Sequence, residues 1–339
     1  MDKKIGISIL AIVIIAALFG LVWWHGTLVS TTPYTGPVEK IRLVTSTSGP
    51  DLSSLIWIAE AQGYFSDEGL DITFTEEATG VQAQEKVASG QADIATDSDF
   101  GFVGDSFTLG NLRILASIDQ SRVVDVVARR DSGIDVPSDL TGKKIGVTSG
   151  IAPEFFFNGF LVAHGISPSQ VDMINIPVVD LKEAIIRGTV DAVATIDPAS
   201  YDTKKALGAN GISWSAQPDQ TFSWFVISSD QFLKAHPEAA TRFLESLVSA
   251  ERFLKANPDT CKQIIRDRLA ENRDYFDQNW PKHTFAIALD QSSLVALEDE
   301  ARWIIATKFA STTVMPDYLN FMYFDALTEA KPEAVTIIH

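Results

Sequence analysis

The sequence reads Val44-Thr45-Ser46-Thr47-Ser48-Gly49-Pro50 after its first short apolar segment, and Val147-Thr148-Ser149-Gly150 about a hundred residues later. Each stretch is followed by a helical pattern that ends at a glycine, then by an apolar segment and a second helical pattern. Related stretches close both patterns, Gly90-Gln91-Ala92-Asp93-Ile94-Ala95 and Gly188-Thr189-Val190-Asp191-Ala192-Val193. Strands that alternate with helices of this length indicate parallel sheets. The repeat therefore predicts a duplicated β-α-β-α-β unit, and with it an α/β protein of two similar lobes.

Length and composition favour a globular protein with two domains. The chain has 339 residues, of which 46% are hydrophobic and 21% are charged, and this length suits two cores better than one. Acidic residues number 44 and basic residues 27, so the formal net charge is −17. This balance argues against nucleic acid as a partner, because nucleic acid requires a basic surface. The single cysteine, Cys261, excludes a disulfide within the chain and a cysteine-based metal site.

The N-terminal segment has the pattern of a membrane-spanning helix. Residues 5–24 carry no charge and follow Lys3 and Lys4, and a helix of that length crosses a bilayer. The lysines are expected to stay in the cytoplasm, which places the rest of the chain outside. Residues 1–24 are thus predicted to be a membrane anchor. A cleaved signal peptide is the alternative, although no small-residue cleavage site stands beside the long apolar run. Residues 25–38 are predicted to form a tether.

Three further stretches resemble a known protein family. They run from Ile58 to Leu70, from Val87 to Ile94 and from Asp139 to Val147. In this order and spacing they resemble the substrate-binding proteins of ABC importers. The most similar branch binds nitrate, taurine, aliphatic sulfonates and thiamine pyrimidine precursors. The resemblance covers residues 40–230 well and the helical tail loosely.

The resemblance implies the type II periplasmic-binding-protein fold, in which each lobe is a mainly parallel sheet flanked by helices. Two hinge crossings join the lobes. Residues 39–120 and 228–339 are expected to form lobe 1, and residues 121–227 to form lobe 2. The apolar strand at residues 222–228 is interpreted as the return crossing.

The resemblance also implies a function. We expect an extracytoplasmic solute-binding component of an ABC importer, which captures a small sulfonate-like or taurine-like ligand between its lobes. It would deliver this ligand to a permease with a cytoplasmic ATPase. A monomer without a cofactor is expected, tethered to the cytoplasmic membrane by its N-terminal segment. The alternatives are a binding protein for a thiamine pyrimidine precursor, a pyrimidine-biosynthesis enzyme on the same fold, and the ectodomain of a signalling complex. The related enzyme carries a cysteine-rich motif that this sequence lacks.

The candidate ligand site lies at the ends of the predicted strands. Ligands of open parallel sheets bind beyond the carboxyl ends of the strands, and both Val-Thr-Ser turns hold that position. Hydroxyl groups together with the free N–H groups of a helix N-terminus suit a sulfonate, nitrate or carboxylate. The same hydroxyls alternatively cap their own helices. The predicted ligand-binding residues at the strand ends are Thr45, Ser46, Thr47, Thr96, Asp97, Ser98, Thr148, Ser149, Gly150 and Asp197.

Two acids and one tryptophan leave the ligand class open. Asp97 and Asp197 either cap helices or bind an amine or a ring N–H of the ligand. If both face the cleft, a zwitterion such as taurine, or an aminopyrimidine, fits better than nitrate. Trp224 is predicted to line the site and stack on a flat ligand, with core packing as the alternative.

The sequence shows no constellation for catalysis or metal binding. None of its five histidines stands near a nucleophile or has the spacing of a metal ligand. A phosphate-binding glycine loop is also absent from the sequence. We therefore expect a binding protein rather than an enzyme.

Overall fold

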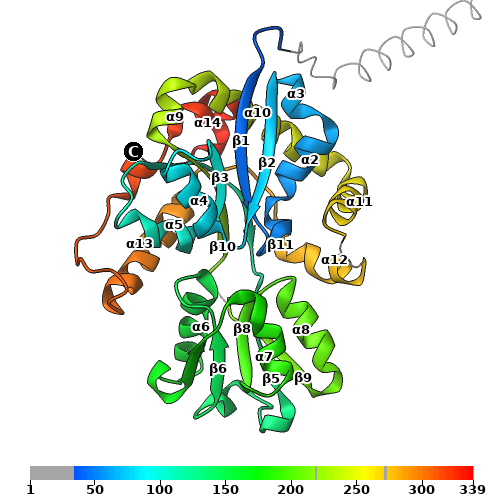
Figure 1. The fold of residues 1–339 in the computed structure, drawn as a ribbon, viewed down its shortest axis with the longest axis vertical. Coiled ribbons are helices and arrows are strands. Elements are labelled where there is room, and N and C mark those ends of the chain that lie inside the picture. The colour runs from blue at the N-terminus through cyan, green and yellow to red at the C-terminus, as the bar shows by residue number, and fades with distance from the viewer. Residues whose placement is uncertain (1–33, 218–219, 271–272, 339) are drawn as a thin grey trace, which may run out of the picture. The chain divides into compact units, whose positions relative to one another are not determined.

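The computed structural model describes residues 34–217, 220–270 and 273–338. The predicted anchor or signal segment, residues 1–24, and most of the predicted tether lie outside the described residues. Within the described part of the chain, no helix is both long and apolar enough to span a membrane. Residues 37–339 form one unit, which contains two β-sheets (Figure 1).

The first sheet has the strand order β11-β4-β10-β3-β1-β2. Strand β1 pairs in parallel with β2 and β3, whereas β10 runs antiparallel to β3 and β4, and β11 antiparallel to β4. Every residue of β3 and β10 is buried, because central strands are covered on both faces. The strands are β1 (Glu39–Ser46), β2 (Leu70–Glu77), β3 (Ile94–Ser98), β4 (Leu112–Ser121), β10 (Phe222–Ser229) and β11 (His283–Thr284).

The second sheet, with the order β7-β6-β8-β5-β9, repeats the arrangement of the first. Strand β6 pairs in parallel with β7 and β8, and β5 runs antiparallel to β8 and β9. Val44 lies opposite Ala95 in the first sheet, and Gly146 lies opposite Val193 in the second. Each copy of the predicted unit forms its own set of parallel strands, which confirms the two-lobed α/β fold. The strands are β5 (Val124–Arg129), β6 (Lys144–Val147), β7 (Asp172–Asn175), β8 (Ala192–Ile196) and β9 (Gly211–Ser215).

Helices flank both sheets, and the C-terminal helices pack on elements of the first. Helix α10 contacts α2, α3 and α14, and α13 contacts α5. With the first sheet lie α2 (Ser54–Gln62), α3 (Tyr64–Asp67), α4 (Gly80–Ala88) and α5 (Asp99–Ser106), and with the second lie α6 (Ala152–Ala163), α7 (Leu181–Ile186) and α8 (Ala199–Leu207). The C-terminal helices are α9 (Asp230–Ala235), α10 (Pro237–Ala256), α11 (Pro258–Leu269), α12 (Arg273–Asn279), α13 (Gln291–Ala306) and α14 (Phe324–Ala330).

Local sequence explains where the helices nearest the candidate site begin. The Thr79 side chain accepts a hydrogen bond from Gln82 N and caps α4, and the Ser98 side chain accepts one from Gly101 N and caps α5. Pro153 stands in the first turn of α6, where its missing N–H leaves no helical hydrogen bond unmade. The structure thus places helix N-termini directly after strand ends, as the sequence pattern predicts.

The return crossing differs from the prediction. Strand β10 pairs with β4 along its whole length, from Phe222 opposite Ser121 to Ser229 opposite Leu112. Residues 222–228 therefore belong to the first sheet and are not a crossing. The chain passes between the sheets through residues 122–123 and returns through residues 216–221, of which 218–219 lie outside the described residues. The apolar character of β10 reflects its central position between β3 and β4, because its side chains are buried on both faces of the sheet.

Candidate functional site

The N-termini of α4, α5 and α6 meet at a cavity between the two sheets. The first two helices belong to the first lobe and α6 belongs to the second. We call this the inner cavity, and about 30 Å³ of it is open to the centres of water molecules, which is room for very few waters. Its lining consists of Ser46, Ser48, Thr79, Gly80, Val81, Asp97, Ser98, Ile151, Ala152, Pro153, Ile196, Phe222 and Trp224.

A second hollow, which we call the outer chamber, adjoins the inner cavity and shares Ser48 and Ile196 with it. Its volume is about 210 Å³. Both lobes contribute to its walls, and its lining is Thr47, Ser48, Gly49, Ala78, Val178, Val179, Ile196, Asp197, Pro198, Ala199 and Asp202. We refer to the two hollows together as the cleft.

The structure brings some of the predicted site residues together in this cleft. Four of them line the inner cavity, namely Ser46, Asp97, Ser98 and Trp224. Thr47 and Asp197 line the outer chamber. Thr45 and Thr96 are fully buried and line neither hollow.

The second Val-Thr-Ser turn contributes nothing to the lining of either hollow. The Thr148 hydroxyl donates to the Ile176 carbonyl at 2.7 Å, Ser149 N donates to the Asn175 side chain at 3.1 Å, and Gly150 N donates to the Glu154 carboxylate at 2.8 Å. The polar groups of this turn are thus paired with residues of the second lobe itself. The three residues that follow, 151–153, line the cavity in its place. The structure therefore does not bring the second Val-Thr-Ser turn to these hollows beside the first, and its part in ligand binding stays a prediction.

Asp97 is the last residue but one of β3 and lines the inner cavity. Its side chain is 2% exposed, and Oδ1 accepts a hydrogen bond from Ser98 N at 2.7 Å. Oδ2 has no hydrogen-bond partner among the described residues. The carboxyl group fits against Gly80 and Gly101, where a Cβ atom on either glycine would overlap it. Burial raises the pKa of Asp97 well above its ordinary value, while the bond from Ser98 N opposes this.

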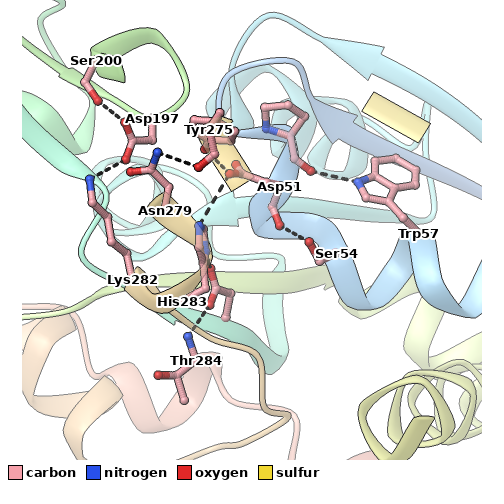
Figure 2. A network of polar contacts seen from close by, with 12 residues as sticks. Asp51, Ser54, Trp57, Asp197, Ser200, Tyr275, Asn279, Lys282, His283 and Thr284 are labelled. Atoms are coloured by element: carbon pink, nitrogen blue, oxygen red, sulfur yellow. Dashed lines mark hydrogen bonds and ion pairs between the residues drawn. The ribbon is translucent and has the colours of Figure 1, made fainter. Parts of the chain in front are cut away.

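Asp197 is held by other side chains of the protein. Its Oδ2 lies 2.7 Å from Lys282 Nζ, and its Oδ1 accepts a hydrogen bond from the Ser200 hydroxyl (Figure 2). Burial raises the pKa of Asp197, and the charge of Lys282 lowers it. Lys282 also lies 3.2 Å from Asp125 of β5. Because Lys282 precedes β11 of the first sheet, these ion pairs link the two lobes. Asp97 lines the inner cavity and Asp197 lines the outer chamber, so the two acids stand at different hollows of the cleft.

Trp224 forms part of the inner wall and is mostly covered. Its indole N–H donates to the Ser53 hydroxyl at 3.0 Å, and its ring stacks on Phe222 with centroids 5.9 Å apart. Only 3% of its surface is exposed. The ring therefore packs in the core and also lines the cavity, while its stacking on a flat ligand stays a prediction.

Aromatic rings join the lobes at the side of the cleft. Phe155 of α6 stacks on Phe100 of α5, with centroids 5.5 Å apart, and meets the edge of Trp303 of α13 at 5.7 Å. Phe156 packs at 6.3 Å from Phe222 of β10. These contacts hold α6 of the second lobe against helices and a strand of the first.

A buried charged cluster next to Lys282 anchors β11 to the first sheet. His283 Nδ1 lies 2.7 Å from Asp119 Oδ2, and His283 Nε2 lies 3.5 Å from Asp51 Oδ2 (Figure 2). The Tyr275 hydroxyl donates to the same Asp51 oxygen. Burial opposes the charge of the imidazolium, but the two carboxylates outweigh burial and raise the pKa of His283 to about 10. The sequence reasoning missed this cluster, since its members are far apart along the chain.

The two sheets and the helices that flank them have the periplasmic-binding-protein fold. The chain belongs to the NMT1/THI5-like family, whose model matches residues 53–261, more than half of the chain. Among solved structures, the periplasmic aliphatic sulphonate binding protein SsuA from Escherichia coli is similar in fold, with a TM-score of 0.70 at 15% sequence identity. The match covers 85% of this chain and 98% of SsuA.

Two curated relatives are similar in sequence. YtlA of Bacillus subtilis (strain 168), whose name describes it as a binding protein, is 25% identical over 198 residues, or 57% of this chain. The 4-amino-5-hydroxymethyl-2-methylpyrimidine phosphate synthase of Aspergillus parasiticus is 23% identical over 224 residues, or 62% of this chain. The matched region spans 59% of the length of YtlA and 65% of the length of the synthase.

Proposed function

We propose that this protein is a solute-binding component of an ABC importer, and that it captures a small sulfonate-like anion in the inner cavity. One observation carries the proposal, namely that the N-termini of three helices from both lobes converge on this cavity. The partial positive charge at the N-terminus of each helix favours an anion. The family membership and the names of YtlA and SsuA support the same class of function.

The rest of the transport cycle is part of this proposal. The ligand enters when the lobes separate, because the inner cavity is too small to admit a sulfonate in the present arrangement. The lobes then close, and the protein delivers the ligand to a permease with a cytoplasmic ATPase. In this proposal the protein is an extracytoplasmic monomer, and its N-terminal segment tethers it to the membrane.

A thiamine pyrimidine precursor is the second candidate ligand. The stacked rings of Phe222 and Trp224 at the cavity wall favour a flat heterocycle, and one relative is named as a pyrimidine phosphate synthase. An enzymatic role has less support, because Cys261 is buried in α11. In addition, no cluster of His, Cys, Asp and Glu that could hold a metal ion occurs among the described residues.

A thermal-shift screen tests the proposed function. The panel consists of 1-propanesulfonate, taurine, nitrate and an aminopyrimidine, and a sulfonate is expected to raise the melting temperature. A ligand at about a hundred times its Kd stabilises the folded protein by about 2.7 kcal/mol. If the aminopyrimidine alone raises the melting temperature, the second candidate replaces the first. If none of the panel does so, both proposed ligand classes fail.

A pair of matched variants locates the site. Ser46 and Ser149 hold equivalent positions in the two Val-Thr-Ser turns, but only Ser46 lines the inner cavity. The Ser46 hydroxyl accepts from Ser48 N at 3.0 Å and donates to the Ser48 carbonyl at 3.1 Å, so it also holds the turn that lines the cavity. Replacement of Ser46 by alanine is expected to weaken sulfonate binding about five-fold, the usual value of one hydrogen bond. Ser149→Ala should bind as the wild type does. Equal effects of both variants in isothermal titration would place the ligand elsewhere.

Removal of the Phe155 ring tests lobe closure. Phe155→Ala is expected to weaken 1-propanesulfonate binding about tenfold, because the ring contacts between the lobes stabilise the closed state. Phe309 provides the control, since it is 53% exposed and stacks on the same Trp303 at 5.4 Å. Phe309→Ala removes a ring that stacks on Trp303 from within the C-terminal part of the chain. Isothermal titration compares the variants, and equal affinities would contradict the closure role of Phe155.

A further inference from the structure

Asp97 is a buried acid without a counter-charge. The residues that line the inner cavity include no lysine, arginine or histidine. Other acids lie close to Asp97 on α5, namely Asp99 and Asp105, and their charges raise its pKa further. Glu85 of α4 acts on Asp105, and Glu300 of α13 lies beside Asp99. An ionised Asp97 would therefore be a desolvated charge among like charges, which is a costly state.

The geometry shows where a proton on Asp97 would lie. Oδ1 already accepts from Ser98 N, and the carboxyl group is confined between Gly80 and Gly101. Oδ2 has no partner among the described residues, although the side chain lines the cavity on which the helix N-termini converge. A proton on Oδ2 would thus be a buried donor without an acceptor in the described part of the protein, on a side chain that lines the cavity. A buried donor without an acceptor costs free energy that an incoming acceptor recovers.

We propose that Asp97 acts as a neutral carboxylic acid that donates a hydrogen bond from Oδ2 to an oxygen of the anionic ligand. This inference rests on the proposed function and adds a specificity to it. The site accepts a fully ionised oxyanion, and it disfavours a ligand that places an ammonium group or another donor at this point. Binding is then coupled to proton retention, because an ionised Asp97 would repel the same ligand.

The sign of the pH dependence follows from this arrangement. The bound anion stabilises the protonated carboxyl, so the complex holds its proton to a higher pH than the free protein does. Affinity is constant below the pKa of free Asp97 and falls about tenfold per pH unit above it. A ligand with an ammonium group on an ionised Asp97 would show the opposite slope.

The test uses 1-propanesulfonate, which remains ionised over the whole pH range. Isothermal titration from about pH 6 to about pH 10 covers the range of documented buried acids. The wild type is expected to lose affinity as the pH rises, whereas Asp97→Asn should lose this dependence and bind more tightly than the wild type at the upper end. The asparagine amide donates in place of the Oδ2 proton at every pH. Asp97→Ala, which has no donor, should bind about tenfold more weakly than the wild type at pH 6.

A neighbouring acid provides the matched control. Asp99 is also buried, but it accepts hydrogen bonds from Ser223 N at 2.8 Å and Phe100 N at 2.9 Å and does not line the cavity. Burial raises its pKa to about 7. The affinity of Asp99→Asn is still expected to fall as the pH rises. The fall should begin at a lower pH than in the wild type, because the charge of Asp99 no longer raises the pKa of Asp97. A flat profile in Asp99→Asn together with a sloping one in Asp97→Asn would assign the proton to Asp99 and overturn the proposal.

A second measurement is independent of any ligand. The infrared difference spectrum between ligand-free wild type and Asp97→Asn at pH 7 should contain the C=O band of a protonated carboxyl. A carboxylate band in its place overturns the proposal, as does sulfonate affinity that is independent of pH or rises with pH in the wild type. If 1-propanesulfonate binds at no pH, the proposed function fails and donation to a sulfonate fails with it. The infrared band still decides whether Asp97 is neutral.

Discussion

Replacement of Asp119 by alanine is expected to lower the free energy of unfolding by about 3–5 kcal/mol, the usual cost of breaking a buried ion pair. Asp119 is fully buried in β4, accepts from His283 Nδ1 at 2.7 Å and accepts from Thr284 N at 3.1 Å. Its loss leaves the imidazolium with Asp51 as its remaining carboxylate partner in the cluster and releases β11 from the first sheet. Urea denaturation measures the change.

The exposed pair of Arg130 and Asp135 is the control for this variant. Their side chains are 45% and 67% exposed, and solvent screens such pairs so well that they contribute about 0–1 kcal/mol. Asp135→Ala should therefore change the free energy of unfolding by less than about 1 kcal/mol. If Asp119→Ala is no more harmful than Asp135→Ala, the buried cluster does not stabilise the fold.

The same cluster predicts a pH dependence of stability. The pKa of His283 is raised to about 10 in the folded protein and is about 6.5 in an unfolded chain. The protonated histidine therefore stabilises the fold fully below about pH 6.5, and this contribution is lost as the pH rises towards 10. The difference in the free energy of unfolding between the wild type and Asp119→Ala should therefore become smaller as the pH rises from about 6.5 to about 10. A difference that stays constant to pH 10 would mean that His283 is not the group that titrates.

Replacement of Gly101 by alanine is expected to destabilise the protein by about 1–3 kcal/mol, as overpacking does. A Cβ atom there would overlap Asp97 Oδ2 and lie 2.6 Å from Oδ1. This loss of stability is opposite to the usual effect of a glycine-to-alanine replacement. Inside a helix, alanine normally makes the protein more stable than glycine does by about 0.5–1 kcal/mol. Urea denaturation gives the free energies.

Gly104 is a matched control on the same helix. It is exposed, and a Cβ atom there meets no heavy atom within 4 Å. Gly104→Ala should therefore stabilise the protein by about 0.5–1 kcal/mol. In the double variant with Asp97→Ala, the cost of Gly101→Ala should largely disappear, since the carboxyl group that it displaces is absent. If Gly101→Ala alone stabilises the protein, the carboxyl group of Asp97 is not tightly packed against Gly101.

The sequence predicted the fold well because its signals are local. The alternation of apolar segments and helical patterns within each repeat depends on residues that are near neighbours along the chain. These set the parallel strands β1, β2 and β3 and their counterparts β6, β7 and β8. The position of β10 could not be read in the same way. A strongly apolar strand has the same composition in a hinge as in the middle of a sheet.

The candidate site was predictable in part. Strand ends and the helices that follow them are adjacent in sequence, which is why Ser46, Asp97 and Ser98 were predicted and line the inner cavity. Residues 79–81 and 151–153 were missed, although Pro153 in the first turn of a helix signalled the N-terminus of α6. Equivalent turns of a repeat have the same local sequence. The packing of the lobes decides which of the two reaches the cavity.

The sequence by itself determined the duplicated unit, the strand ends at which a site can form, and the types of side chain available there. Only the tertiary structure decided which partners these side chains meet. Asp197 pairs with Lys282, which is 85 residues away, and Asp119 pairs with His283, which is 164 residues away. Such pairs depend on how segments that are distant along the chain pack together, which no local pattern encodes. For the same reason Asp97 and Asp197, alike in sequence as acids at strand ends, differ in the structure: one is neutralised by a lysine and the other faces the cavity.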